Sequence, residues 1–516
     1  MKSEIKRGTI LGYLEIILRM LIAFFYTPIM LRIMGNSEYG LYSLVSSVTA
    51  YLSVLDMGFG NAIVRYVSKY KSTGDKKSEN KINGMFLILY SIIGLITIII
   101  GLIIWAKIDK LFPALAPEEL NKAKIIMMIL VGTIAVSFPL GIFDSYVIAS
   151  EKFQFLKILN ILKEISIPAV MLPLLFMGYK AIALVIVTCT FNILYHVFTM
   201  IYSFKKLDMH ISINAKEFDF ELLKNIYSYS FFVFLGLIVD TVFNNTDQVI
   251  LGSVCGTTAV SIYAVASKIT QINTSCSTTI SGLFLPKITK MLKDKDSDKK
   301  ISDVFIKVSR IQMYIMVLIA SGFVTFGRQF INLWVGKEYI DAYYITLILI
   351  IPSIVPLTQN IGISVIQAKG IHQFRAIVYL IIAALNVGIS IPLAKAYQGI
   401  GAAIGTAIAN LLGQIITMNI FYYYKAKLDI PQYWKNMIGF LIRIIPISLV
   451  FIIVNKFITF NWFKLILMII LYAIAYVGIT YTYMNNEEKE YITTLMKKIN
   501  LKKGGKNEEN NKKLDA

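Results

Sequence analysis

A row of polar side chains interrupts an apolar segment near the middle of the chain. Asp240, Asn244, Asp247 and Gln248 follow spacings of four, three and one residues, which place most of the row on one face of a helix. Charged side chains within a bilayer are costly and usually face a protein interior or a water-filled cavity. Because a carboxylate in such a place can bind a proton or a sodium ion, Asp240 and Asp247 are our candidates for ion coupling.

The next apolar segment carries a second polar row, formed by Lys268, Gln271, Ser275 and Thr278. The hydroxyl groups could serve only to hydrogen-bond one helix to another, without any ligand. Lys268 could form a structural ion pair with a carboxylate of the preceding segment, or it could contact a ligand directly. The two readings of Lys268 are compatible, since a proton or an ion could break and remake such a pair.

In the first apolar segment, Glu15 and Arg19 are four residues apart and share a helix face, where they could neutralise each other. An alternative comes from a weak internal repeat at an offset of 221 residues, the distance from Gly35 to Gly256. The same offset places Arg19 onto Asp240. The two halves would then present a cation and an anion to one shared cavity.

Asp56 lies in the second apolar segment, in the stretch LDMGFGNAIVRY, where Gly58 and Gly60 predict a bend. An aspartate accepts hydrogen bonds from freed backbone N–H groups, so Asp56 could cap a helix that restarts after the bend. It could equally line a cavity, together with Thr49 and Ser53 on the same helix face.

The composition is that of an integral membrane protein. Of the 516 residues, 56% are hydrophobic and only 16% are charged, and the mean hydropathy is +0.66. Apolar runs of about 20 residues, the length of a helix that crosses a bilayer, recur along the chain. Strand barrels are excluded, because their strands need only about ten alternating residues. The three cysteines and three histidines lack ligand spacing and predict neither a disulfide framework nor a metal site.

We expect an all-α fold of about fourteen transmembrane helices, the first of them a retained span rather than a signal peptide. Segments rich in Lys and Arg alternate with poor ones, as expected when basic loops stay in the cytoplasm. Both termini are therefore predicted to be cytoplasmic, and the net charge of +20 reflects topology rather than nucleic-acid binding. The predicted helices are 8–34, 39–67, 82–105, 123–149, 155–177, 180–203, 223–251, 257–284, 304–331, 341–367, 371–394, 399–424, 436–456 and 462–484.

The repeat offset spans six predicted helices, an even number, so both copies would have the same orientation in the membrane. Such parallel repeats are related by a pseudo-two-fold axis along the membrane normal and hold substrate between them. We predict a first six-helix bundle at 1–203, a cytoplasmic linker at 204–222 and a second six-helix bundle at 223–425. Helices 13 and 14 follow at 436–484, and a basic cytoplasmic tail at 485–516.

The stretch MGNSEYGLYSLVSSVTAYLSVLDMGFGNAIVRYVSKY, with the span count and the basic loop that follows it, resembles the polysaccharide transporter family. These are oligosaccharide flippases of the multidrug/oligosaccharidyl-lipid/polysaccharide exporter superfamily. The resemblance implies two six-helix bundles around a central cavity, two further helices, and alternating access without ATP. It also implies a substrate of undecaprenyl-pyrophosphate-linked sugar units, moved to the outer leaflet for O-antigen (lipopolysaccharide), capsule or exopolysaccharide assembly. The chain has no GxxxxGK[ST] phosphate-binding loop, in agreement with transport that does not use ATP.

In such a cavity, Arg19 and Lys268 would suit a pyrophosphate, the guanidinium as a planar fork and the ammonium as a point charge. We expect coupling to a proton or a sodium ion, and no other cofactor, metal or catalytic residue. The predicted cavity residues are Arg19, Asp56, Asn244, Lys268 and Gln271.

Three other functions compete with this hypothesis. A flippase for the lipid-linked peptidoglycan precursor would have the same architecture and a cationic cavity. A multidrug or cation antiporter of the same superfamily would have a mainly acidic or aromatic cavity. A membrane glycan polymerase or transferase would need a catalytic set on long loops, for which this chain has no room. We expect a monomer in the bacterial cytoplasmic membrane, functionally linked to glycosyltransferases and a polysaccharide polymerase.

Overall fold

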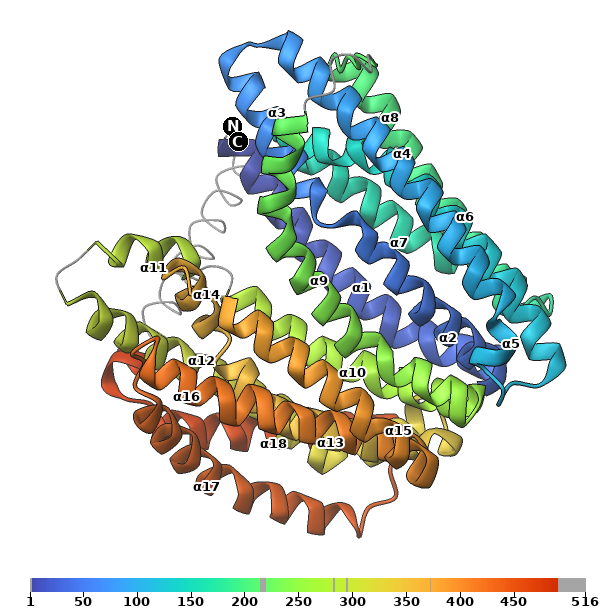
Figure 1. Ribbon diagram of the computed structural model, residues 1–516. Coiled ribbons are helices and arrows are strands. Elements are labelled where there is room, and N and C mark those ends of the chain that lie inside the picture. The colour runs from blue at the N-terminus through green and yellow to red at the C-terminus, as the bar shows by residue number, and fades with distance from the viewer. Residues whose placement is uncertain (1, 214–219, 282–283, 294–295, 372, 491–516) are drawn as a thin grey trace, which may run out of the picture.

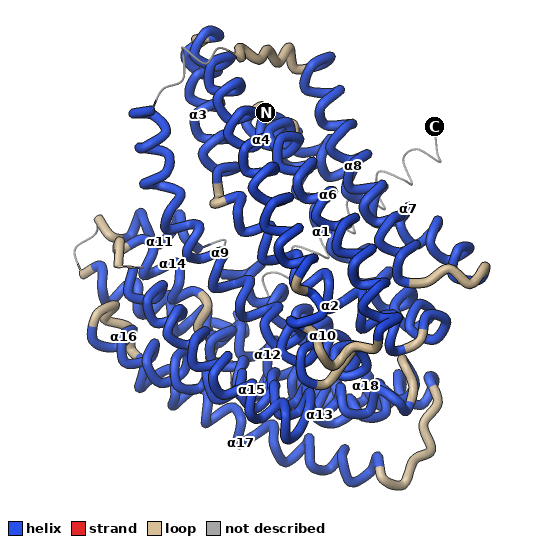
Figure 2. Tube along the Cα trace, turned by 45° about the vertical axis from the view of Figure 1, so that its right-hand side comes forward, coloured by secondary structure: helices blue, strands red, loops and turns tan. Residues whose placement is uncertain are grey.

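The computed structural model describes residues 2–213, 220–281, 284–293, 296–371 and 373–490. All regular structure within these residues is helical, as Figure 2 shows. The helices are α1 (Lys2–Met34), α2 (Asn36–Ser53), η1 (Val54–Asp56), α3 (Phe59–Thr73), α4 (Lys76–Ala106), α5 (Ile108–Leu111), α6 (Pro117–Ala149), α7 (Phe153–Phe176), α8 (Ala181–Lys206), α9 (Phe220–Val254), α10 (Thr257–Ser281), α11 (Leu285–Met291), α12 (Ser297–Trp334), η4 (Lys337–Tyr339), α13 (Ile340–Thr358), α14 (Ile361–Ala368), α15 (Gln373–Asn410), η5 (Leu411–Thr417), α16 (Met418–Tyr424), α17 (Ile430–Asn455) and α18 (Trp462–Tyr483).

The helices gather into two groups. Helices α1 to α8 form the first bundle, in which α6 contacts α2, α3, α4 and α8, and α7 packs on α1. Helices α9 to α16 form the second bundle, in which α9 packs on α15 and α12 on α13. Helices α17 and α18 pack on α12. The two bundles lie side by side and touch through α2, α9 and α10, as Figure 1 shows.

The prediction of an all-α membrane fold is confirmed. Eleven helices of the described residues are long and apolar enough to cross a membrane. One of them, 373–424, bends at Tyr397 and Gln398, whose backbone angles are not helical, so its two arms can cross separately. The count of about fourteen spans stays a prediction.

Two helices that were expected to be continuous are interrupted. The predicted helix 39–67 breaks between α2 and α3, where Met57 and Gly58 take left-handed backbone angles. The expectation of one helix over 341–367 was wrong, because α13 and α14 are separated by Gln359 and Asn360. Those two side chains donate to partners on other helices, to Asn419 Oδ1 at 2.6 Å and to Ser277 Oγ at 3.2 Å, and the bonds hold the turn.

The first turns of the two bundles both contain a glycine with a positive φ. Gly35 between α1 and α2 has a φ of 83°, and Gly256 between α9 and α10 has a φ of 85°. Both values lie in the region that glycine adopts without steric cost. The N–H of Gly35 donates to the Leu31 carbonyl, four residues earlier, and that of Gly256 donates to the Leu251 carbonyl, five residues earlier. The two glycines that the repeat aligns therefore share a backbone conformation, although the hydrogen bonds of their turns differ.

We call the end of the molecule with the turns at 74–75 and 207–213 the basic end, and the end with the turns at 35 and 255–256 the opposite end. The bundles meet near the opposite end. Toward the basic end they diverge, so that α3 of the first bundle lies apart from α11 and α14 of the second (Figure 1).

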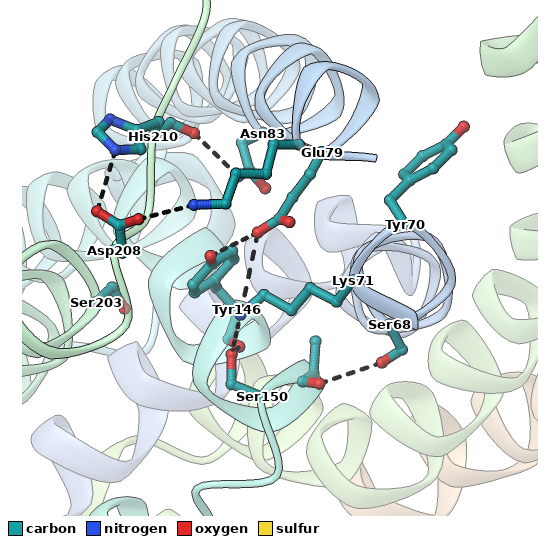
Figure 3. Close-up of polar contacts among 12 residues, drawn as sticks. Ser68, Tyr70, Lys71, Glu79, Asn83, Tyr146, Ser150, Ser203, Asp208 and His210 are labelled. Carbon is teal, nitrogen blue, oxygen red and sulfur yellow. Dashed lines mark hydrogen bonds and ion pairs between the residues drawn. The ribbon is translucent and has the colours of Figure 1, made fainter. Parts of the chain in front are cut away.

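At the basic end, the segment 207–213 after α8 is fixed on the first bundle (Figure 3). Asn83 Nδ2 donates to the His210 carbonyl at 3.1 Å, and the Ser212 N–H donates to the Asn80 carbonyl at 3.1 Å. Lys76 Nζ lies 3.0 Å from Asp208 Oδ2, and this hydrogen bond holds the pKa of Asp208 below its usual range. The chain therefore leaves the first bundle from a fixed point.

Glu488, just beyond α18, ties the chain to α12. Its carboxylate accepts from Arg310 Nε at 2.7 Å and Nη2 at 2.9 Å, and from Tyr314 and the Asn485 N–H at 3.0 Å each. Burial alone would raise the pKa of Glu488, but these hydrogen bonds outweigh it and hold the pKa below its usual range.

We predict that Glu488→Gln lowers the free energy of unfolding by about 2 kcal/mol at neutral pH, because it leaves Arg310 short of its charged partner. A lowered folded-state pKa stabilises above the unfolded value of about 4.3, and this contribution is lost as pH falls through the folded-state pKa. The difference between variant and wild type should therefore shrink in acid. Thermal unfolding of the detergent-solubilised protein across pH measures it. Glu487→Gln, whose carboxylate pairs with Lys307 in solvent, is the control and should shift stability little.

Candidate functional site

A cavity of about 820 Å³ lies between the two bundles. Its wall comes from α2 of the first bundle and from α9, α10, α13, α15 and α16 of the second. Hydroxyl, amide and tyrosine side chains make up most of the lining. Four charged side chains line it as well, namely Asp240, Asp247, Lys268 and Arg375. Most of the residues that line the cavity are therefore polar, and the cavity holds both signs of charge.

Both polar rows of the sequence lie on this cavity. Asn244, Lys268 and Gln271 line it, and so do Asp240 and Asp247. The spacings of three and four residues place each row along one helix face, and α9 and α10 turn those faces toward the cavity.

Lys268 reaches the cavity from α10 without a carboxylate partner among the described residues. Its Nζ lies 3.5 Å from Thr27 Oγ1 of α1 and 5.3 Å from the centre of the Tyr39 ring of α2. The hydroxyl and the ring face are weak substitutes for an anion. The expected alternative, an ion pair with Asp240 or Asp247, is not among the contacts of the described residues, and the Asp247 carboxylate accepts from the Tyr263 and Thr406 hydroxyls instead.

Arg375, near the start of α15, is the cavity cation that sequence reasoning missed. Its guanidinium lies 4.4 Å from the Tyr379 ring, and its Nε is buried without a hydrogen-bond partner. Arg375 stands alone at the start of an apolar run and belongs to neither polar row of the sequence. An available signal was Tyr379 four residues later, which a helix places beside it.

Arg19 does not line the cavity. Its Nη2 lies 3.1 Å from Glu15 Oε1 and 3.1 Å from Glu164 Oε1 of α7, while Lys157 Nζ lies 2.9 Å from Glu15 Oε2. The interpretation of Glu15 and Arg19 as a pair that neutralises itself therefore agrees better with the structure. The pair is extended by Lys157 and Glu164 of α7, which no local spacing in the sequence links to α1. The network fastens α1 to α7.

Asp56 does not line the cavity either. Its Oδ2 accepts from the Gly58 N–H at 3.2 Å, and its Oδ1 accepts from the Tyr90 hydroxyl of α4 at 2.7 Å. Asp56 could have capped the restarted helix or lined a cavity, and its contacts are those of a cap. Tyr90 adds a tertiary support that the sequence did not indicate.

Asp247 sits in a pocket of oxygen atoms at the edge of the cavity and is only 3% exposed. Its Oδ2 accepts from the Tyr263 hydroxyl and, at 2.6 Å, from Thr406 Oγ1, whereas its Oδ1 is buried without a partner. Asn386 donates to Thr406 Oγ1 at 3.1 Å, and Ser390 donates to Asn386 Oδ1 at 2.6 Å. A buried carboxylate oxygen without a partner, among neutral oxygen atoms, suits a proton or a small hard cation.

The two hydroxyl residues of the second polar row, Ser275 and Thr278, donate within α10. Ser275 Oγ donates to the Gln271 carbonyl at 2.8 Å, and Thr278 Oγ1 to the Thr274 carbonyl at 3.2 Å. Because a hydroxyl oxygen also accepts, these side chains present acceptors to the cavity. Their role therefore extends beyond hydrogen bonds between helices, because they also offer acceptors to a ligand in the cavity.

Comparison with known proteins agrees with this architecture. The family model described as "Polysaccharide biosynthesis protein" matches residues 5–292, more than half of the chain. The chain belongs to this polysaccharide biosynthesis family. A Shigella flexneri protein described as a candidate O-antigen transporter is 20% identical over 393 residues, which cover 75% of this chain and 90% of that protein.

Solved structures resemble this family member in fold. A lipid II flippase MurJ in an inward closed conformation has a TM-score of 0.72 at 17% identity, covering 92% of this chain and 98% of its own. An inward-facing multidrug resistance MATE transporter of the MOP superfamily has a TM-score of 0.59 at 15% identity, covering 79% and 99%. The predicted polysaccharide family is confirmed, and the fold of this multi-pass membrane protein is similar to that of the two solved transporters.

We predict that the cavity is hydrated and open from the basic end. In a chain whose three cysteines are replaced by serine, Gln271→Cys should react with a membrane-impermeant maleimide added on the side of the basic end. Ile272→Cys is the matched control, because Ile272 is the next residue on α10, is 41% exposed and does not line the cavity. A thiol that faces hydrocarbon does not ionise and stays unlabelled. Equal labelling of both positions would contradict the assignment of the cavity.

Proposed function

We propose that this protein is a flippase for undecaprenyl-pyrophosphate-linked oligosaccharide repeat units. It moves them across the bacterial cytoplasmic membrane by alternating access, for the synthesis of a cell-surface polysaccharide. The observation that carries the proposal is the pair of cations on the cavity, Lys268 and Arg375, neither of which forms an ion pair with a carboxylate of the described residues. Family membership and the Shigella relative support it.

The charge of the cavity suits a pyrophosphate that links a lipid to a sugar. Such a diester carries two negative charges, and the two cations offer two positive ones. Asp240 and Asp247 share the cavity, and a cation bound at Asp247 would offset the charge of that carboxylate. The buried Nε of Arg375 has a donor to spare, and the Lys268 ammonium has only a hydroxyl and a ring near it. Hydrogen bonds between ionised groups are the strong ones, so phosphate contacts would supply much of the binding energy.

The rest of the wall suits sugar hydroxyl groups. Asn244, Gln271 and Gln359 carry amides on the cavity, and the Gln359 Oε1 is buried without a partner. Tyr379 and Tyr422 provide ring faces for the apolar side of a sugar. The sugars that this surface prefers depend on many dispersed contacts.

We propose that the basic end faces the cytoplasm, because lysine-rich loops are retained there. The bundles diverge toward that end, so the cavity would receive the lipid-linked substrate from the inner leaflet. We expect the protein to act as a monomer beside glycosyltransferases and a polymerase, which make and use the repeat units.

We predict that Lys268→Ala and Arg375→Ala each lower surface glycan by at least about tenfold in a flippase-null host, because each removes a charged hydrogen bond to phosphate. Arg375→Lys should fall between, since a point charge replaces a planar fork. Glycan blots quantify export, and immunoblots verify equal protein levels.

Arg443→Ala is the control, because Arg443 lies on α17 and its guanidinium stacks on Tyr483 away from the cavity. Normal glycan export by both cavity variants would remove the cations from the mechanism. Rescue of a strain that lacks its peptidoglycan-precursor flippase, without glycan export, would instead favour the lipid II class of substrate. Export of a cationic drug would favour the antiporter.

We propose that Asp247 couples transport to a proton or a sodium ion. Asp247 Oδ1, Thr406 Oγ1 and the Ser390 hydroxyl would hold the ion, and its charge would offset that of the carboxylate. Asp240 is the weaker candidate for ion coupling. Its side chain is exposed to the cavity, and the cation Arg375 lines the same cavity.

We predict that Asp247→Asn slows transport about tenfold and abolishes its response to an imposed ion gradient, because an amide cannot exchange charge with the bound ion. Inverted vesicles with an imposed proton or sodium gradient measure this. Asp240→Asn, the other cavity carboxylate, should keep the gradient dependence. If Asp247→Asn keeps it too, or if wild-type transport ignores both gradients, Asp247 is not the coupling site.

A further inference from the structure

At the opposite end, one carboxylate accepts hydrogen bonds from hydroxyl groups of both bundles. Glu119 Oε1 of α6 accepts from Ser37 Oγ of α2 at 2.5 Å and from Thr257 Oγ1 of α10 at 2.7 Å. The Ser37 and Thr257 hydroxyls are themselves 3.3 Å apart. Thr257 is only 4% exposed, whereas Ser37 is exposed, so the contact lies at the surface of the seam with Thr257 on its inner side.

The backbones of the two bundles touch at the same place. A Cβ built on Gly40 of α2 would lie 1.8 Å from the Thr257 carbonyl oxygen, so only glycine fits there. A Cβ on Gly252 of α9 would lie 2.4 Å from Leu44 Cδ1 of α2. The first turn of α10 can pack this closely on α2 because Gly40 has no side chain.

The first bundle positions the Glu119 carboxylate by itself. Its other oxygen, Oε2, accepts from the Ala116 N–H at 3.0 Å, within the first turn of α6. The carboxylate is thus held in place whether or not α10 is seated. It offers a fixed acceptor onto which the Thr257 hydroxyl can dock and from which it can leave.

Other bonds between the bundles gather around this point. Trp334 Nε1 donates to the Phe24 carbonyl at 2.7 Å, and Asn36 Nδ2 donates to Glu338 Oε2 at 3.2 Å. Deeper along α2, Ser47 donates to Gln248 Oε1 at 3.0 Å. Since the bundles diverge toward the basic end, these contacts close the cavity on the opposite side.

We propose that Glu119 is the gate residue of the opposite end: it latches Thr257 of the second bundle to Ser37 of the first, and substrate leaves only when this latch opens. The inference rests on the proposed alternating access but not on the identity of the substrate. Glu119 touches neither the cavity nor the substrate in this conformation and acts by positioning α10.

The test measures access to the cavity rather than transport. The reporter is Gln271→Cys in the chain without native cysteines, in sealed membrane vesicles of both orientations, with an impermeant maleimide added outside. Glu119→Ala should raise the labelling rate from the opposite end about tenfold, because it removes the acceptor for both hydroxyls. Glu119→Gln, which keeps an acceptor oxygen, should raise it less.

Glu118→Ala is the matched control. Glu118 is the preceding residue of α6, and its carboxylate pairs with Lys122 of the same helix, so the control should label like wild type. Labelling of Glu119→Ala at the wild-type rate would overturn the proposal. Since labelling needs no substrate, this result is distinct from a failure of the proposed flippase activity.

A cross-link provides a second test that does not depend on a loss of contact. The hydroxyls of Ser37 and Thr257 are close enough for cysteines at both positions to form a disulfide. Oxidised Ser37→Cys/Thr257→Cys protein should stop glycan export and block labelling from the opposite end, and a reductant should restore both. Export that continues with the disulfide formed would overturn the latch.

Discussion

The seating of α10 on α2 is the contact on which the remaining architecture depends. Gly40 has no side chain to hold the Thr257 carbonyl away, and Gly252 accommodates Leu44 in the same manner. With the bundles fixed together at one end, their divergence at the other leaves a polar volume of about 820 Å³ between them. Helix packing this close also gives a membrane interface its stability, because small residues bring backbones together where lipid offers no hydrophobic driving force.

The cost of charge in a bilayer sorts the charged residues into two groups. In the first bundle, Arg19 forms ion pairs with Glu15 and Glu164, and Lys157 forms one with Glu15, so these residues hold α1 against α7. In the second bundle, Lys268 and Arg375 line the cavity, and neither forms an ion pair with a carboxylate in the part of the chain that the structure describes, although Asp240 lines the same cavity. An unpaired cation persists in a membrane protein when water or an anion reaches it. From this asymmetry between the bundles we propose that the second bundle binds the anion.

The helical fold and the two polar rows could be predicted because both depend on local periodicity. Hydrophobic length indicates a span, and spacings of three and four place Asp240, Asn244 and Lys268 on one face of their helices. What could not be predicted depends on tertiary contacts. Arg19 forms an ion pair with Glu164 outside the cavity, and the Tyr90 hydroxyl donates a hydrogen bond to Asp56. Arg375 reaches the cavity only because α15 packs on α9, which no spacing in the sequence reveals.

The central claim is that Lys268 and Arg375 bind the pyrophosphate of a lipid-linked oligosaccharide. Native mass spectrometry of the purified protein with undecaprenyl-pyrophosphate-linked oligosaccharide tests this most directly, with a neutral glycolipid as the reference ligand. We predict that wild type binds the pyrophosphate-linked lipid in preference to the neutral one, and that Lys268→Ala/Arg375→Ala loses this preference while keeping its fold. An unchanged preference in the double variant would contradict the account.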